Sequence, residues 1–372
     1  MVLDVNKRVY NHRPGLCRQV EEIVHGAEDI ALVEDEGIAF ITSGLFYMFP
    51  RAKEVQGRIF LYDFNQDGTY HAEVLTINGD HDQENFHPHG ISHSVTSSGV
   101  VRLFVINHSK SFEHSVMVFD WNRKSRQLDL VKVIKDDKFI RPNNLVAVSE
   151  GAFIITNDGS AQTPITNFLE AFSMIPSCSI VFYDGQASSW LMSTTTSPNG
   201  VAIDRAGKHL IVSHANTETI SVYRIGEGYR SLSHLVDIPL LTTMDNLYVD
   251  KEGAVWTVSP VSSRNMSRWF QNGRSPCTER CHRPPGKLIL SDRAPSQACL
   301  FKTLLSNCHN VAIQVLRIKF SKDFKSWEVT EPFVDDGRLL SASSVAVPFK
   351  NQLLIGSVCR QLVHCSITAE TV

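Results

Sequence analysis

Residues 30–42 read IALVEDEGIAFIT, which is an apolar run, an acidic turn containing Gly37, and a second apolar run. Short apolar runs rich in β-branched residues are typical of β-strands, and glycine permits the tight turn between them. The stretch therefore predicts a hairpin of two buried strands. Five later stretches of the chain follow the same template, so this hairpin is the repeating unit of the predicted fold.

The six repeats recur at similar intervals along the chain. They start at Ile30, Ile91, Leu145, Val201, Leu247 and Val345. The intervals are about 46 to 61 residues, with one gap near 98, and such periods are typical of four-stranded propeller blades. A β-sandwich also contains many short strands, but it does not explain a six-fold period. The sequence thus predicts an all-β fold, a six-bladed β-propeller that forms one domain over residues 1–372.

The composition argues against two classes of protein. The 372 residues carry a net charge of −3 and contain no basic run, which argues against binding of nucleic acid phosphates. No stretch approaches the roughly 20 consecutive apolar residues of a membrane span, and residues 1–8 show no signal-peptide core. The compartment must therefore be inferred from other features, chiefly the cysteines.

The long gap between the fifth and sixth repeats contains a cysteine-rich segment at about residues 261–310. Four of the eight cysteines lie there: Cys277, Cys281, Cys299 and Cys308. Their spacing departs from that of common zinc ribbons, so two disulfides are favoured over a zinc site, and the pairing is left open. Just upstream, Asn265-Met-Ser matches an N-glycosylation acceptor, which predicts a glycan on Asn265.

Polar residues precede every repeat. They are Glu28, Asp29, His89, Asn143, Asn144, Asn199, Asp245, Asn246, Ser343 and Ser344. If the repeats are blades, equivalent positions lie at the same radius and height, so these side chains converge on the central channel. Five of them, Glu28, Asn143, Asn199, Asp245 and Asn246, offer oxygen donors with two formal charges, which suits calcium better than zinc. The alternative is that the Asx residues only form turns at strand starts.

Two histidines are candidates for acid–base chemistry. His89 occupies the position before the second repeat, and His108 ends the hairpin of that repeat. A histidine beside a metal-bound carbonyl can act as a general base on water, and a second histidine can orient the first. His87, His93 and His214 are interpreted as structural, because nothing in the sequence places them at the channel mouth.

Eight runs of the chain resemble the paraoxonase/arylesterase family in order and spacing. They are GAEDIALVEDEGIAFITSGL at 26–45, FHPHGIS at 86–92, FVINH at 104–108, RPNNLVAV at 141–148, TNDG at 156–159, SPNGVAID at 197–204, MDNLYVD at 244–250 and QLLIGSV at 352–358. The resemblance extends from Cys17 to Cys365. It implies a six-bladed propeller that holds two calcium ions, one catalytic and one structural, and that hydrolyses aryl esters or lactones.

The resemblance also assigns roles to individual residues. It makes Glu28, Asn143, Asn199, Asp245 and Asn246 the ligands of the catalytic calcium, and His89 and His108 the histidine dyad. Asp29 and the backbone carbonyl of Ile91 would hold the structural calcium. The third ligand of that ion is normally an aspartate but falls on Asn144, which removes one negative charge and predicts weaker binding.

The remaining implications concern disulfides, location and partners. Cys17 and Cys365 match the pair that joins the two chain ends in the family, which implies an oxidising compartment, the cell exterior or the ER lumen and its membrane. The family's thiol position reads Ser259 in this chain, followed by Pro260. The cysteine-rich segment looks like an insertion relative to usual members, and loop 159–174, which diverges from the family, is expected to set substrate preference.

The implied partners are a small-molecule ester or lactone, with membrane or lipoprotein association and a membrane-protein client as further possibilities. The alternative functions are a non-catalytic chaperone or accessory subunit for membrane proteins and a gluconolactonase-like propeller enzyme. The first of these differs in class from the hydrolase, because it needs no catalytic residues. The second shares the architecture and the central metal but not these motifs.

Overall fold

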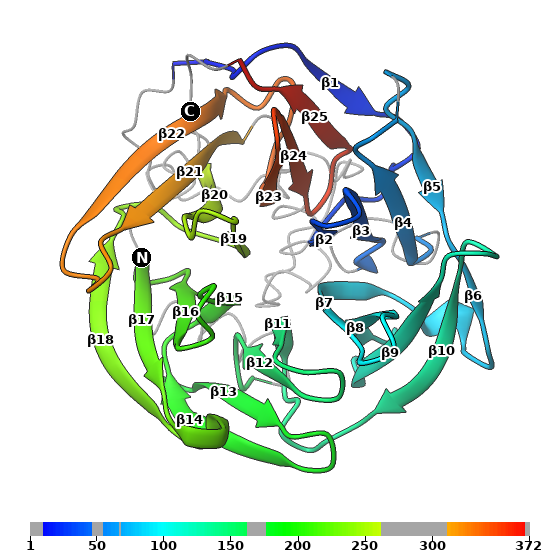
Figure 1. Ribbon diagram of the computed structural model, residues 1–372, viewed down its shortest axis with the longest axis vertical. Helices are drawn as coiled ribbons and strands as arrows, with labels where there is room; N and C mark the ends of the chain where they lie inside the picture. Colours follow the sequence, from blue (N-terminus) through cyan, green and yellow to red (C-terminus); the bar gives the residue numbers. More distant parts are fainter. Residues whose placement is uncertain (1–9, 47–54, 67, 162–175, 262–310, 369–372) are drawn as a thin grey trace, which may run out of the picture.

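The chain folds as a ring of six β-sheets around a central axis, as a computed structural model shows (Figure 1). The structure describes residues 10–46, 55–66, 68–161, 176–261 and 311–368. The helices that lie wholly within these residues are two short 3-10 turns, η3 (Gln83–Asn85) and η4 (Glu227–Tyr229). None of the described helices is long and apolar enough to cross a membrane. The prediction of a six-bladed β-propeller is confirmed.

Each sheet is one blade, and its strands follow one another from the axis outward. Blade 1 contains β2 (Ile30–Val33), β3 (Ile38–Ser43), β4 (Arg58–Asp63) and β5 (Ala72–Val74), and blade 2 contains β7 (Pro88–Val95), β8 (Val101–His108), β9 (His114–Asn122), β10 (Gln127–Ile134) and β6 (Thr76–Asn78). Blade 3 contains β11 (Pro142–Ala147), β12 (Phe153–Asn157), β13 (Cys178–Tyr183) and β14 (Ser188–Thr195), and blade 4 contains β15 (Pro198–Ile203), β16 (His209–His214), β17 (Thr219–Ile225) and β18 (Leu232–Pro239). Blade 5 contains β19 (Leu247–Val249), β20 (Val255–Val261), β21 (Ala312–Phe320) and β22 (Trp327–Asp335), and blade 6 contains β23 (Ser343–Phe349), β24 (Gln352–Ser357), β25 (Leu362–Ser366) and β1 (Cys17–Val20).

The innermost strand of every blade contains one of the six predicted repeat starts. Neighbouring innermost strands contact each other in sequence around the axis, and β23 contacts β2 to close the ring. Equivalent positions in the repeats therefore lie at equivalent places around the axis. This arrangement brings together the polar residues that precede the repeats.

Hydrophobic side chains hold neighbouring blades together. Six buried clusters occur among the described residues, and each draws its side chains from two adjacent sheets. Along β3, for example, Phe40 packs toward blade 2, whereas Ala39 and Ile41 pack toward blade 6. Successive residues of a strand point to opposite faces, and in this strand both faces are buried. This burial explains why the inner strands read as continuous apolar runs rather than as alternating ones.

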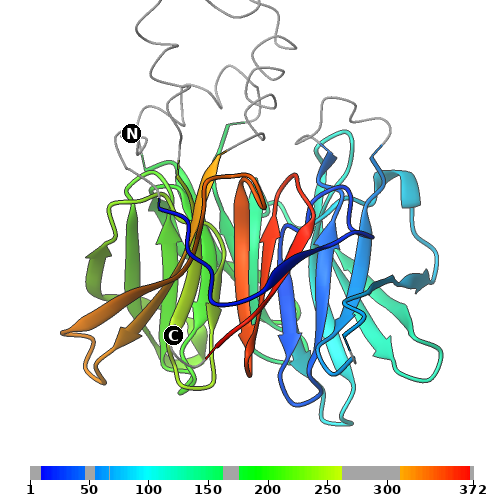
Figure 2. The same cartoon turned by 90° about the horizontal axis from the view of Figure 1, so that it is seen from above.

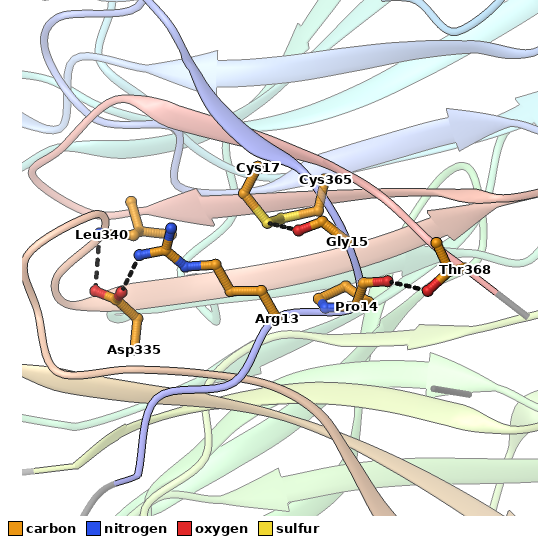
Figure 3. Close-up of a disulfide and its surroundings, with 8 residues drawn as sticks. All are labelled: Arg13, Pro14, Gly15, Cys17, Asp335, Leu340, Cys365 and Thr368. Atoms are coloured by element: carbon orange, nitrogen blue, oxygen red, sulfur yellow. Dashed lines mark hydrogen bonds and ion pairs between the residues drawn. A yellow bond between two sulfur atoms is a disulfide. The ribbon is translucent and has the colours of Figure 1, made fainter. Parts of the chain in front are cut away.

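Blade 6 joins the two ends of the chain. Strand β1 pairs antiparallel with β25, with Cys17 opposite Cys365, and a disulfide links these two residues as predicted (Figure 2; Figure 3). Further contacts hold the N-terminal segment, among them an ion pair of 3.1 Å between Arg13 and the buried Asp335 and a hydrogen bond of 3.0 Å from Thr368 Oγ1 to Pro14 O. The last blade is thus completed by a strand from the start of the chain.

Candidate active site

The predicted site residues from different blades meet at one end of the ring axis. Asn246 of blade 5 donates from Nδ2 to Glu28 Oε1 of blade 1 at 3.0 Å and to Glu28 O at 3.1 Å. Asn144 of blade 3 donates from Nδ2 to Asn246 Oδ1 at 2.8 Å. Ser344 of blade 6 donates to Glu28 O at 2.6 Å. Residues far apart in the sequence therefore form one buried polar cluster, as the repeat pattern predicts.

Two glycines allow the inner strands to approach closely enough for this cluster to form. A Cβ atom on Gly90 would lie 2.7 Å from Asn143 O, and one on Gly200 would lie 2.7 Å from both Asp245 O and Asn246 Cα. Contacts below 3.0 Å with backbone atoms would force the strands apart. The two glycines therefore set the distance between blades at the positions that carry the proposed ligands.

Hydroxyl groups on the second strand of four blades fix the backbone at the predicted ligand positions. Thr42 Oγ1 accepts a hydrogen bond from Asp29 N at 3.1 Å, and Thr156 Oγ1 accepts one from Asn144 N at 3.2 Å. Ser213 Oγ accepts from Gly200 N at 2.8 Å, whereas Thr257 donates to Asn246 O at 3.1 Å. Each bond satisfies a buried backbone group, so the backbone just before or at the start of these inner strands is held in place.

Three oxygens of the predicted calcium ligands have no hydrogen-bond partner. They are Glu28 Oε2, Asn143 Oδ1 and Asn199 Oδ1, and all three atoms are buried. Asn143 Nδ2 donates to Asp158 Oδ2 at 3.1 Å and Asn199 donates to Asp245, so each amide group is oriented with its oxygen unpaired. An unsatisfied buried polar atom costs about 1–3 kcal/mol. A hard cation such as calcium binds carboxylate and amide oxygens, so this set of donors fits calcium.

The buried carboxylates also favour a cation. Burial raises the pKa of Asp245 well above its usual range, and the charge of Glu28 acts in the same direction. Burial likewise raises the pKa of Asp29 to about 7, again with Glu28 adding to the effect. A bound cation would stabilise negative charges that lie close together in a buried site. No group of three or more His, Cys, Asp or Glu side chains in the described part of the chain is arranged to hold a metal; most donors at this site are asparagines.

The predicted histidine pair extends into a row of three. His89 Nε2 lies 3.3 Å from Glu28 Oε1, and His89 Nδ1 lies 2.9 Å from His108 Nε2. On its other side, His108 Nδ1 lies 2.7 Å from His114 Nδ1. A neutral imidazole has one N–H donor and one acceptor nitrogen, so His108 donates to one neighbour and accepts from the other. The row therefore links the buried Glu28 to His114, which is only half-buried.

The three rings differ in their tendency to hold a proton. Burial by itself lowers the pKa of His89, but the charges of Glu28, Asp158 and Asp245 outweigh burial, and the net shift is upward. Burial and the two neighbouring histidines lower the pKa of His108 well below its usual range, and burial lowers that of His114 to about 4. His89 is thus the ring of the row that is best able to accept a proton.

His114 and Asp158 were missed as site residues in the sequence. His114 begins β9 directly opposite His108 at the end of β8, and only residues 109–113 separate the two. Two histidines that flank so short a turn are the signal that predicts their contact. Asp158 follows β12, pairs with Arg141 at 2.5 Å between Oδ1 and Nε, and also accepts from Asn143. It lies within the TNDG run, where its side chain positions Asn143.

The three histidines interpreted as structural differ in their surroundings. His87 is buried and contacts the carbonyl oxygens of Gly44 at 3.0 Å and Glu84 at 3.2 Å, which fits a structural role. His93 lies within β7, and burial lowers its pKa. His214 ends β16 as His108 ends β8, so it lies nearer the site end than expected; its Nδ1 contacts Thr196 O at 2.7 Å.

The residues of the second predicted metal position hydrogen-bond to one another. Asp29 Oδ2 accepts from Ile91 N at 2.8 Å and from Asn144 Nδ2 at 2.9 Å. Asp29 Oδ1 accepts from Ile30 N at 2.9 Å. The residues assigned to the structural calcium therefore lie close together, and hydrogen bonds join them directly.

Several predicted features lie outside the described residues. These are Asn265, Cys277, Cys281, Cys299 and Cys308. Loop 159–174 is described only in part. Among the described cysteines, Cys359 is disulfide-bonded, as Cys17 and Cys365 are, whereas Cys178 carries a buried thiol. At the position of the family's thiol, Ser259 is fully buried and hydrogen-bonds with Thr242.

Solved structures with the same fold include a gluconolactonase and a calcium-binding protein. A gluconolactonase from Xanthomonas campestris has a TM-score of 0.54 at 15% sequence identity and covers 98% of this chain and 97% of its own. Regucalcin from Agrobacterium tumefaciens, described as a calcium-binding protein, has a TM-score of 0.52 at 11% identity and covers 96% of each chain. At these identities the likeness concerns the fold alone.

Sequence comparisons cover nearly the whole chain. Mechanosensory abnormality protein 6 of Caenorhabditis elegans is 29% identical over 380 residues, 99% of this chain and 90% of its own. Serum paraoxonase/lactonase 3 of Oryctolagus cuniculus is 27% identical over 354 residues, 95% of this chain and 89% of its own. The Arylesterase family model matches residues 9–282 and 289–367, including much of the cysteine-rich segment. The chain therefore belongs to the arylesterase family.

Proposed function

We propose that this protein is a calcium-dependent hydrolase of aryl esters or lactones. The observation that carries this proposal is a site with three unpaired buried oxygens, on Glu28, Asn143 and Asn199, in which Glu28 also contacts the first histidine of the row, His89. A structural cluster has no need of unsatisfied oxygens beside a histidine whose pKa is raised. The match to the Arylesterase family model and the similarity to serum paraoxonase/lactonase 3 support the same activity.

Calcium would be held by Glu28, Asn143, Asn199, Asp245 and Asn246. When bound, it supplies positive charge that polarises a substrate carbonyl and stabilises the oxyanion that forms on attack. The protein contributes the arrangement of the ligands. Asp158 and Asp245 hold the amide groups of Asn143 and Asn199 so that the two amide oxygens remain available.

The histidines would handle the proton of the attacking water. His89 accepts this proton as the water oxygen bonds to the carbonyl carbon, and the proton is later returned to the leaving oxygen. His108 orients the His89 ring through the contact of 2.9 Å, and His114 connects His108 to the half-exposed end of the row. Charge on His89 is stabilised by Glu28, 3.3 Å away.

The direct test is hydrolysis of phenyl acetate and of an aliphatic δ-lactone by the purified full chain. We expect activity with calcium, loss of activity after chelation, and recovery when calcium but not magnesium is restored. Folding after chelation is checked by circular dichroism, so that loss of activity is not confused with loss of structure. Hydrolysis of neither substrate by the folded, calcium-bound protein would reject the proposal.

Substitution of the histidines provides a second prediction. His89→Gln is expected to lower kcat about a hundredfold or more, within the usual contribution of a general base. His114→Gln is expected to lower kcat less, about tenfold, because His114 acts through His108. His234→Gln, at an exposed histidine on β18, is the matched control and should leave kcat unchanged. Unchanged turnover in His89→Gln would remove His89 as the base.

The alternative of a non-catalytic accessory subunit is not favoured, because the proposed ligands and both dyad histidines are present together. The Cys17–Cys365 disulfide supports an oxidising location, the cell exterior or the ER lumen. Association with membranes, lipoproteins or a membrane-protein client stays a prediction.

A further inference from the structure

Both oxygens of the Asp29 carboxylate already accept hydrogen bonds from the protein, so a metal ion bound there would compete with these donors. Its Oδ1 accepts a hydrogen bond from Ile30 N at 2.9 Å, and its Oδ2 accepts two, from Ile91 N at 2.8 Å and Asn144 Nδ2 at 2.9 Å. Asp29 is 4% exposed, so water does not replace a broken bond readily. This carboxylate is therefore satisfied by the protein alone.

The amide group of Asn144 is also satisfied, and its neighbours fix its orientation. Nδ2 donates to two acceptors, Asp29 Oδ2 and, at 2.8 Å, Asn246 Oδ1. On the opposite side, Oδ1 accepts from Val201 N at 3.4 Å. A rotation of the amide by 180° would place its oxygen against the Asp29 carboxylate and its N–H groups against the Val201 N–H. The hydrogen-bonding partners of Asn144 therefore favour the orientation with Nδ2 toward Asp29.

The two metal positions implied by the family therefore differ in this chain. At the first position, three buried oxygens have no hydrogen-bond partner: Glu28 Oε2, Asn143 Oδ1 and Asn199 Oδ1. At the second position, every side-chain oxygen of Asp29 and Asn144 has one. The space beside Asp29 Oδ2 is also lined by N–H groups of Ile91 and Asn144, which present partial positive charge. A cation there would be repelled by these groups.

We infer that the amide of Asn144 takes the place of the second calcium ion, so that the protein binds one calcium rather than two. The amide does the structural work expected of that ion, because it ties Asp29 of blade 1 and Asn246 of blade 5 to blade 3. The hydrogen-bonded chain continues from Asn246 to Glu28, and so the Asn144 amide also supports the first position. This inference rests on the proposed function for the existence of the first calcium site.

The test is the number of calcium ions bound, measured by equilibrium dialysis of the full chain and atomic emission, with Asn144→Asp as the variant. We expect one equivalent in the wild type and two in Asn144→Asp, because the variant replaces two N–H donors by carboxylate oxygen. Calcium should also raise the melting temperature of Asn144→Asp more than that of the wild type. Asn351→Asp, which adds the same charge in an exposed turn, is the control and should bind as the wild type does.

The outcomes separate this inference from the proposed function. Two equivalents in the wild type, or one equivalent in both the wild type and a folded Asn144→Asp, would overturn the inference. No calcium in the wild type with one equivalent in Asn144→Asp would support the inference and reject the proposed catalytic calcium. If Asn144→Asp does not fold, the wild-type count alone decides between one ion and two.

Discussion

Glu28→Gln is expected to lower kcat/KM for phenyl acetate about a thousandfold and to weaken calcium binding about a hundredfold. Glu28 and Asp245 carry the only two formal charges among the five proposed ligands, and calcium affinity depends strongly on the number of charged ligands. Glutamine keeps the size of the side chain and can still face Asn246, so the expected loss is mainly electrostatic. Loss of one electrostatic contribution to an oxyanion site typically costs a factor of about 100 to 1,000 in rate.

Glu36→Gln is the matched control for this variant. Glu36 lies in the turn of the same hairpin and pairs with Arg123 at the surface, where an ion pair contributes at most about 1 kcal/mol to stability. Its activity and calcium binding should equal those of the wild type. Calcium affinity is measured by calorimetry and rate by initial velocities. A folded Glu28→Gln protein that kept a third or more of the wild-type kcat/KM would show that Glu28 is not part of the reaction site.

The parts of the fold that the sequence predicts are those with both faces buried. The runs at 101–107 and 153–156, for example, are apolar at nearly every position, and they correspond to the second strands β8 and β12. The outermost strands carry no such signal. Strand β14 is mostly exposed or half-exposed, and so is β18, because an outer strand packs less of its surface against its neighbours. Residues at these positions are not constrained to be apolar.

The sequence predicts only some of the strand pairings between distant segments of the chain. Strand β6 pairs in parallel with β10, with Thr76 opposite Gln127, and makes blade 2 five-stranded. The strand has only three residues, which is too short for a recognisable sequence pattern. Its parallel pairing with the outer edge of the blade involves no tight turn that the sequence could reveal. The pairing of β1 with β25 was predicted through the family resemblance and not from the pattern of either strand.

The repeat pattern predicts the site residues at the start of the inner strands. It does not predict those whose role depends on contacts with other strands. Glu28 precedes an inner strand and Asn143 lies at the start of one, so the repeat places both near the axis. His114 begins the third strand of its blade, a position that the repeat template does not cover. The direction of the Asn144 amide depends on Asp29 and Val201 from two other blades, and no pattern within one repeat encodes it.

Removal of the Cys17–Cys365 disulfide, by replacing both cysteines with serine, is expected to lower the free energy of unfolding by about 4–5 kcal/mol. The two cysteines are 348 residues apart, and a cross-link that closes so long a loop strongly restricts the unfolded chain. The melting temperature should fall by about 6 °C, as followed by circular dichroism. Activity should fall at lower temperatures than in the wild type, because blade 6 supplies Ser344, which bonds to Glu28 O at 2.6 Å.

Cys178→Ala serves as the control for this prediction, because it removes a buried sulfur that is not part of this disulfide. Its cost should be no more than about 1–2 kcal/mol, the usual range for most single substitutions. Strand β1 pairs with β25 over four residue pairs, and the Arg13–Asp335 and Thr368–Pro14 contacts also hold the chain ends. Two backbone hydrogen bonds between His12 and Val334 and one from Gln19 Nε2 to Leu339 O add to them. If the double serine variant melts within about 2 °C of the wild type, the strand pairing and the other contacts of the N-terminal segment are sufficient to close the ring, and the disulfide is not a major source of its stability.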